Sequence, residues 1–147
     1  MIGTDRLAQP PAAAHRRRTP VLAALLLMLG IGGFAAVWIL LGTFTGRQHS
    51  WMAVLAALDI ALMLHLGGWA PGPLRAAVAM ASTLLIALIA SWGITASHLG
   101  RALGLLPWES ALKLGFNHAW TLAQLTHGVF DLLWLALALL VAALASR

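Results

Sequence analysis

The polar side chains with the clearest chemical potential lie in a single stretch, residues 117–131, which reads NHAWTLAQLTHGVFD. Gln124, His127 and Asp131 are three and four residues apart, so a helix places them on one face. Carboxylate, imidazole and amide groups bind cations, protons and small polar ligands. The uncharged run LLWLALALLVAALA follows directly, so this polar face leads into a segment suited to lipid.

Two earlier apolar segments also carry polar groups. Asp59 lies about 12 Å along a helix from Trp51, and Ser91, Thr95 and His98 follow one another at i, i+4 and i+7. A charge inside a membrane costs about 3 kcal/mol on insertion scales, so the aspartates should face the bundle interior or a wet cavity. We therefore predict a polar ligand-binding pocket in the outer half of a membrane bundle, lined by Asp59, Asp131, His127, His98, Gln124, Ser91 and Thr95.

The two histidines allow an alternative. His98 and His127 would come from adjacent antiparallel helices at similar depth, where they would ligate a b-type haem or a metal. The protein would then be a haem-containing or quinone-linked electron-transfer subunit. No spacing motif accompanies the pair, and polar groups at the wet end of a membrane helix are commonly only solvated.

Catalytic signatures are missing from the chain. It has no HExxH, GxSxG, phosphate-loop or dinucleotide-binding pattern, and it has no cysteine for a thiolate ligand or nucleophile. We therefore expect a non-enzymatic protein without a resident cofactor, with haem b kept as the cofactor of the alternative.

The amino-acid composition indicates that these residues belong to a membrane protein. Of the 147 residues, 61% are hydrophobic and only 9% are charged, and the mean hydropathy is +0.90, whereas soluble domains carry about 25% charged residues. The net charge of +5 comes mainly from basic residues that flank apolar runs, which favours membrane topology over nucleic-acid binding. The sequence predicts an all-α integral membrane protein with four spans, at about 20–41, 51–70, 74–96 and 125–145.

The remaining segments connect these spans. Residues 1–19 are a short basic leader that we expect to be disordered, and Pro71 and Pro73 mark a tight turn between the second and third spans. Pro107 and Glu109 suit the first turn of a short amphipathic helix over 107–114, which would lie at the membrane interface. Short connections make neighbouring spans antiparallel, so we expect an up-down four-helix bundle within 20–147.

Basic residues predict the orientation. Six lie on the side of the leader, the 70–75 turn and the C-terminus, and three lie on the other side, which places both termini in the cytoplasm. Arg16, Arg17, Arg18 and Arg75 would set this orientation. A tryptophan belt agrees with it, since five tryptophans fall near the opposite face: Trp38, Trp51, Trp92, Trp108 and Trp120.

These expectations describe a small multi-pass protein. The usage of Ala, Leu and Arg suggests a bacterial inner membrane. The predicted function is a binding or accessory subunit of a transport or respiratory complex, with the lipid bilayer and another membrane protein or a second copy as partners, and no nucleic acid.

Overall fold

The computed structural model describes residues 20–47, 49–104 and 129–147. Within these ranges the regular structure is entirely helical: α1 (Pro20–Thr45), α2 (Met52–Leu66), α3 (Pro73–Leu103) and α6 (Val129–Ala145). The prediction of an all-α chain is therefore confirmed for this part of the protein. The expected leader over 1–19 and the expected interfacial helix over 107–114 lie outside the described residues.

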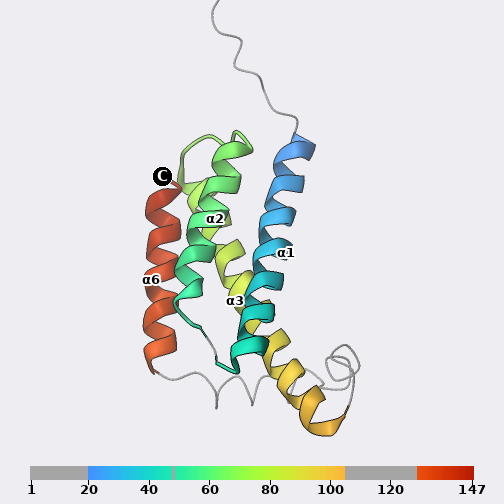
Figure 1. Cartoon of the computed structure of the whole chain (residues 1–147). Coiled ribbons are helices and arrows are strands. Elements are labelled where there is room, and N and C mark those ends of the chain that lie inside the picture. The colour runs from blue at the N-terminus through green and yellow to red at the C-terminus, as the bar shows by residue number, and fades with distance from the viewer. Residues whose placement is uncertain (1–19, 48, 105–128) are drawn as a thin grey trace, which may run out of the picture.

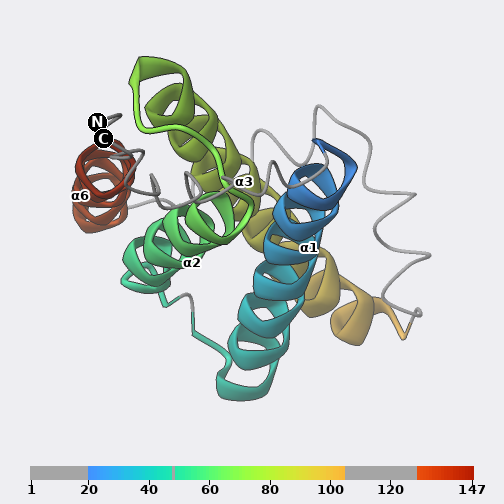
Figure 2. The same cartoon turned by 90° about the horizontal axis from the view of Figure 1, so that it is seen from above.

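The helices form an antiparallel bundle. Figure 1 shows α1 and α3 running in one direction and α2 and α6 in the other. Helices α2 and α3 contact each other and both outer helices, whereas the described parts of α1 and α6 do not contact each other. Viewed from above, α1 and α6 accordingly lie on opposite sides of the α2–α3 pair (Figure 2). We refer to the two ends of the bundle as the Ser50 end, where α1 meets α2, and the Arg75 end, where α2 meets α3.

Two helices are long and apolar enough to cross a membrane. These are α1, with 26 residues, and α3, with 31 residues. Both exceed the approximately 20 residues that a bilayer requires, whereas α2 has 15 residues and α6 has 17 described residues. Large apolar side chains such as Leu25, Leu88 and Leu137 are exposed on the outside of the bundle, as expected of a surface that faces lipid.

Helices α1 and α3 both extend beyond their predicted ends. The predicted end of α1 was Leu41, yet the helix continues to Thr45 because Gly42 lies within it and packs against α3. A Cβ added at Gly42 would be 2.5 Å from Cδ1 of Ile94. The predicted end of α3 was residue 96, but the helix continues to Leu103 and stops at Gly104, whose φ of 64° is left-handed.

Helix α2 is shorter than its predicted span, which extended to Ala70. The N–H of Gly68 donates to the carbonyl of His65 at 3.0 Å, and the N–H of Trp69 donates to that of Leu64 at 3.1 Å. These two bonds form a Schellman motif around Gly68, whose φ is 75°. The glycine at this position therefore stops the helix at Leu66.

Helices α1 and α3 pack closely against each other at the Ser50 end. Gly42 of α1 receives Ile94, and in the reverse sense Gly93 of α3 receives Ile39, again with 2.5 Å between the added Cβ and Cδ1. Because neither glycine has a side chain, the two backbones approach closely. Toward the middle of the bundle the fully buried interior is mostly apolar and includes Ala56, Ala57, Ile60, Ile86 and Ala90.

Arg75 fixes the other end. Its side chain is 7% exposed and donates to the carbonyl oxygens of Ala61 at 3.3 Å and Trp69 at 3.4 Å. These carbonyls belong to the last turns of α2 and to the connection that follows, where a cation complements the negative end of the helix dipole. Arg75 was predicted only to orient the chain in a membrane, and the structure adds this packing role.

Candidate functional site

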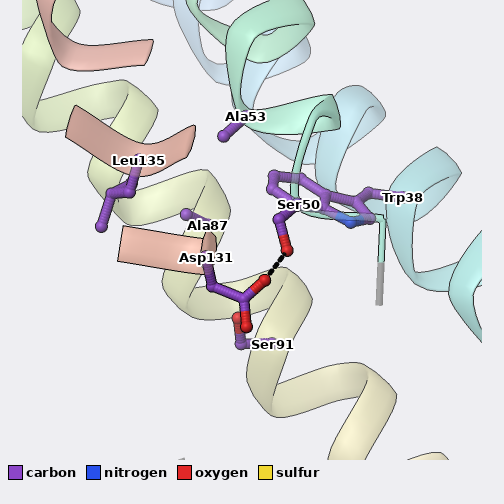
Figure 3. Close-up of a pocket in the computed structure, with 7 residues that line it drawn as sticks. All are labelled: Trp38, Ser50, Ala53, Ala87, Ser91, Asp131 and Leu135. Carbon is purple, nitrogen blue, oxygen red and sulfur yellow. Dashed lines mark hydrogen bonds between the residues drawn. The ribbon is translucent and has the colours of Figure 1, made fainter. Parts of the chain in front are cut away.

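A small cavity at the Ser50 end is lined by side chains from all four helices and from the α1–α2 connection. Its volume is about 30 Å³, and it is partly open. Figure 3 shows that its polar side chains come from segments far apart in the sequence. The lining residues are Trp38, Ser50, Ala53, Ala87, Ser91, Asp131 and Leu135.

The central interaction of this cavity is a hydrogen bond between Ser50 and Asp131. The Ser50 hydroxyl donates to Oδ1 of the Asp131 carboxylate, across 81 positions of sequence (Figure 3). Ser50 is held because its carbonyl accepts the N–H of Ala53 at 3.1 Å, in the turn that leads into α2. Asp131 lies in the first described turn of α6, where the helix dipole favours a negative charge. The bond therefore joins the starts of two parallel helices.

Trp38 contributes a donor to the same cavity. Its side chain is 4% exposed, and its Nε1 is buried without a hydrogen-bond partner among the described residues. An indole N–H can only donate, and a buried donor left without an acceptor is costly. A cavity of about 30 Å³ exceeds the 10–15 Å³ that one water molecule requires. A bound water that accepts from Trp38 would satisfy this group.

Ser91 forms the α3 wall. It is half-buried, and its carbonyl accepts the hydroxyl of Thr95 at 2.9 Å. Such back-bonding is common for threonine inside helices, and it occupies the only hydroxyl donor of Thr95. The cavity thus combines one carboxylate, two serine hydroxyls and one indole N–H.

The structure brings together only part of the predicted pocket. Ser91 and Asp131 line the same cavity, whereas Thr95 lies one turn farther along α3 and is not a lining residue. His98 is exposed and likewise does not line the cavity. Gln124 and His127 lie outside the described residues.

Asp59 was expected in this pocket and is found elsewhere. It faces α1, where a Cβ added at Gly30 would be 3.3 Å from its Oδ2. The cavity wall from α2 is Ala53, six residues earlier, and six residues on a helix correspond to about 120° of net rotation. The prediction compared depths along the helices but not directions around them, and this rotation separates Asp59 from Asp131.

Ser50 and Trp38 were not predicted as site residues. Ser50 was part of an expected turn, and it lies two residues before Met52, the first residue of α2. Trp38 was predicted in an interfacial belt at this end of the bundle, and its side chain is 4% exposed, so it faces the bundle interior. A tryptophan one turn before a glycine-mediated helix contact is a signal for such burial, since close packing encloses its neighbours.

The cavity also bears on the cofactor alternatives. Ligand pockets for drug-sized molecules have volumes of about 300–1,000 Å³, so this cavity does not provide a haem or quinone site. Among the residues that the structure describes, no group of three or more His, Cys, Asp or Glu side chains is placed to hold a metal ion. The predicted His98–His127 pair includes a residue outside the described part and stays a prediction.

Comparisons of this chain with family models, with curated proteins and with solved structures gave no match. Function is therefore inferred from the chemistry of the cavity and of the helix surfaces.

Proposed function

We propose that the protein is a four-span membrane protein without catalytic activity, an accessory subunit whose cavity at the Ser50 end binds one small monovalent cation. The observation that carries this proposal is the Ser50–Asp131 pair, which sets a carboxylate and a hydroxyl at the edge of a cavity of about 30 Å³.

The membrane placement is supported by the outer surface of the bundle. Helices α1 and α3 have the length and composition of spans, and the antiparallel packing of α2 and α6 beside them would carry the chain across twice more. The apolar side chains exposed on α2 and α6, such as Leu58, Leu62, Leu133 and Leu140, would then face lipid. The basic residues of the whole sequence favour the Arg75 end as the cytoplasmic side and the Ser50 end as the outer side.

The ligand class follows from the donor atoms. Carboxylate and hydroxyl oxygens are ligands of hard cations, and Asp131 supplies the compensating negative charge. A water molecule in the cavity would complete the coordination while accepting from the indole of Trp38. The volume restricts the occupant to a single small ion with its water.

The closed middle of the bundle supports a binding role rather than a transport role. Toward the Arg75 end the interior is closely packed, with Ala57, Ile60 and Ile86 fully buried, and the buried hydroxyl of Thr83 donates to the carbonyl of Ala79 within α3. A cation bound beside Asp131 would therefore enter and leave at the same end.

Thermal unfolding in detergent micelles tests the proposal. We expect Tm to rise with added NaCl relative to choline chloride at equal ionic strength, because a ligand that binds only the folded state stabilises it by about 2.7 kcal/mol at a hundredfold excess over Kd. Asp131→Asn should remove this sodium-dependent rise. Asp59→Asn is the matched control and should keep it.

Lithium and potassium chloride extend the test to neighbouring ion sizes. An equal Tm in choline and in all three alkali chlorides would overturn the cation site. The same follows if Asp131→Asn responds to sodium as strongly as the unmodified protein does.

A further inference from the structure

Asp59 occupies the centre of α2, with seven helical residues on each side between Met52 and Leu66. Its side chain is half-buried. No hydrogen bond or ion pair joins it to another residue that the structure describes, in contrast to Asp131. A carboxyl group with this setting is an unsatisfied polar group at the mid-depth of the bundle.

The surface around Asp59 is apolar and exposed. Leu55, Leu62 and Leu66 are at i−4, i+3 and i+7 from Asp59, so they share its side of α2, and all three are exposed. Helices α1 and α2 pack side by side (Figure 2). On α1, Gly33 is one turn beyond Gly30, the residue that faces Asp59, and nothing lies within 4 Å of a Cβ added at Gly33. We name this surface the Asp59 face: Gly33, Leu55, Asp59, Leu62 and Leu66.

The described residues of the chain contain no counter-charge for this position. The arginines Arg47, Arg75, Arg101 and Arg147 all lie at the ends of the helices or in the connections. A second copy of these residues would therefore bring none of its arginines to mid-depth, whichever way it was inserted. The described residues of a second copy therefore supply no counter-charge for Asp59, whereas a basic residue of a different protein would.

We propose that the Asp59 face docks a transmembrane helix of another membrane protein that carries a lysine or arginine at mid-depth. This proposal rests on the membrane placement given under Proposed function and identifies the surface and the partner of the accessory subunit. Ionisable groups inside a membrane pair with one another, because an unpaired charge in lipid is unfavourable. Gly33 lets the partner backbone approach closely, as small residues do at helix interfaces in membranes.

The test uses the full-length protein in lipid vesicles with synthetic polyleucine transmembrane peptides as probes. One peptide has a central lysine, a second has leucine at that position, and a third has its lysine one turn from the end. The chain has no cysteine, so Ala70→Cys provides a single site for a fluorescent donor, and association is measured by energy transfer to a labelled peptide. Ala70 is exposed, lies in the α2–α3 connection and is not a residue of the Asp59 face.

We expect the central-lysine peptide to associate at least about tenfold more strongly than the other two peptides, which corresponds to one interhelical pair in a membrane. Asp59→Leu and Asp59→Asn should both remove this preference. Gly33→Leu should weaken association, whereas Gly32→Leu is the matched control and should not. Gly32 is also exposed, with nothing within 4 Å of an added Cβ, but it lies about 100° away around α1.

Several results would overturn the proposal. Equal association of all three peptides would exclude a charge-dependent partner. Retention of the preference in Asp59→Asn would show that the peptide's lysine does not require the carboxylate of Asp59. Asp131→Asn should dock normally, and an unmodified protein that docks the peptide but shows no sodium-dependent rise in Tm would reject the cation site alone. Protein that fails to float with the vesicles would reject the membrane placement itself.

Discussion

The two aspartates in the described helices have opposite settings. Asp131 accepts a hydrogen bond from Ser50 in a cavity that side chains from four helices enclose. Asp59 lies at the middle of α2 beside exposed leucines and has no hydrogen-bond or ion-pair partner among the described residues. Taken alone, each aspartate would have the same free-energy cost of transfer into lipid. In the folded bundle a hydrogen bond offsets this cost for Asp131 but not for Asp59.

This difference indicates which contacts are internal to the protein. A polar group that the fold satisfies contributes to the stability of the bundle, and removing its partner is unfavourable. A polar group that the fold leaves unsatisfied contributes nothing to that stability and is explained by a contact outside the chain. We therefore assign Asp131 to a site within the bundle and Asp59 to a surface between proteins.

The same substitution at both positions gives the largest expected difference. Asp131→Ala should lower the free energy of unfolding by about 1.5–3 kcal/mol, because it removes a hydrogen bond to a charged group and leaves the Ser50 hydroxyl without its acceptor. Asp59→Ala should change it by no more than about 0.5 kcal/mol, or raise it, because no intramolecular bond is lost. Unfolding by SDS in mixed micelles measures both values. Equal destabilisation by the two substitutions would remove the distinction.

The sequence was sufficient for the elements of the fold but not for the directions of their side chains. Long apolar runs and prolines predicted four antiparallel helices. These elements follow directly from composition and from the lengths of the apolar runs. The predicted helix ends were less accurate, because a glycine can either lie inside a helix at a close contact or end the helix. Gly42 continues α1 because it packs against Ile94, whereas Gly68 ends α2 in a left-handed conformation.

The candidate site was predictable only in part for a related reason. The sequence placed Ser91 and Asp131 at similar depth, and the structure has them in one cavity. It also grouped Asp59 with them, although rotation around α2 directs Asp59 toward α1. Ser50 and Trp38 line the cavity because α1, α3 and the α1–α2 connection pack together. Such packing depends on the relative rotation of helices, which the period of one helix does not determine.

A smaller effect isolates the Ser50–Asp131 bond. A double-mutant cycle with Ser50→Ala and Asp131→Ala should give a coupling energy of about 0.6–1.7 kcal/mol, from the average to the largest value found for hydrogen bonds between membrane helices. The parallel cycle with Ser50→Ala and Asp59→Ala should give no coupling, because these residues do not interact. The same mixed-micelle unfolding measures both cycles. A coupling near zero in the first cycle would mean that the bond does not stabilise the bundle.

The smallest effects are expected beyond the cavity on α3, at Thr95 and His98. His98 is exposed, and the Thr95 hydroxyl bonds only within its own helix, so His98→Ala and Thr95→Val should each change the free energy of unfolding by less than about 0.5 kcal/mol. Neither should alter the sodium-dependent rise in Tm, since neither lines the cavity. Loss of that rise in His98→Ala would place His98 among the cation-binding residues and extend the site along α3 toward residue 103. An unchanged rise would leave Asp131, the two serines and Trp38 as the polar cavity-lining groups among the described residues, with Asp131 as the carboxylate that provides the charge.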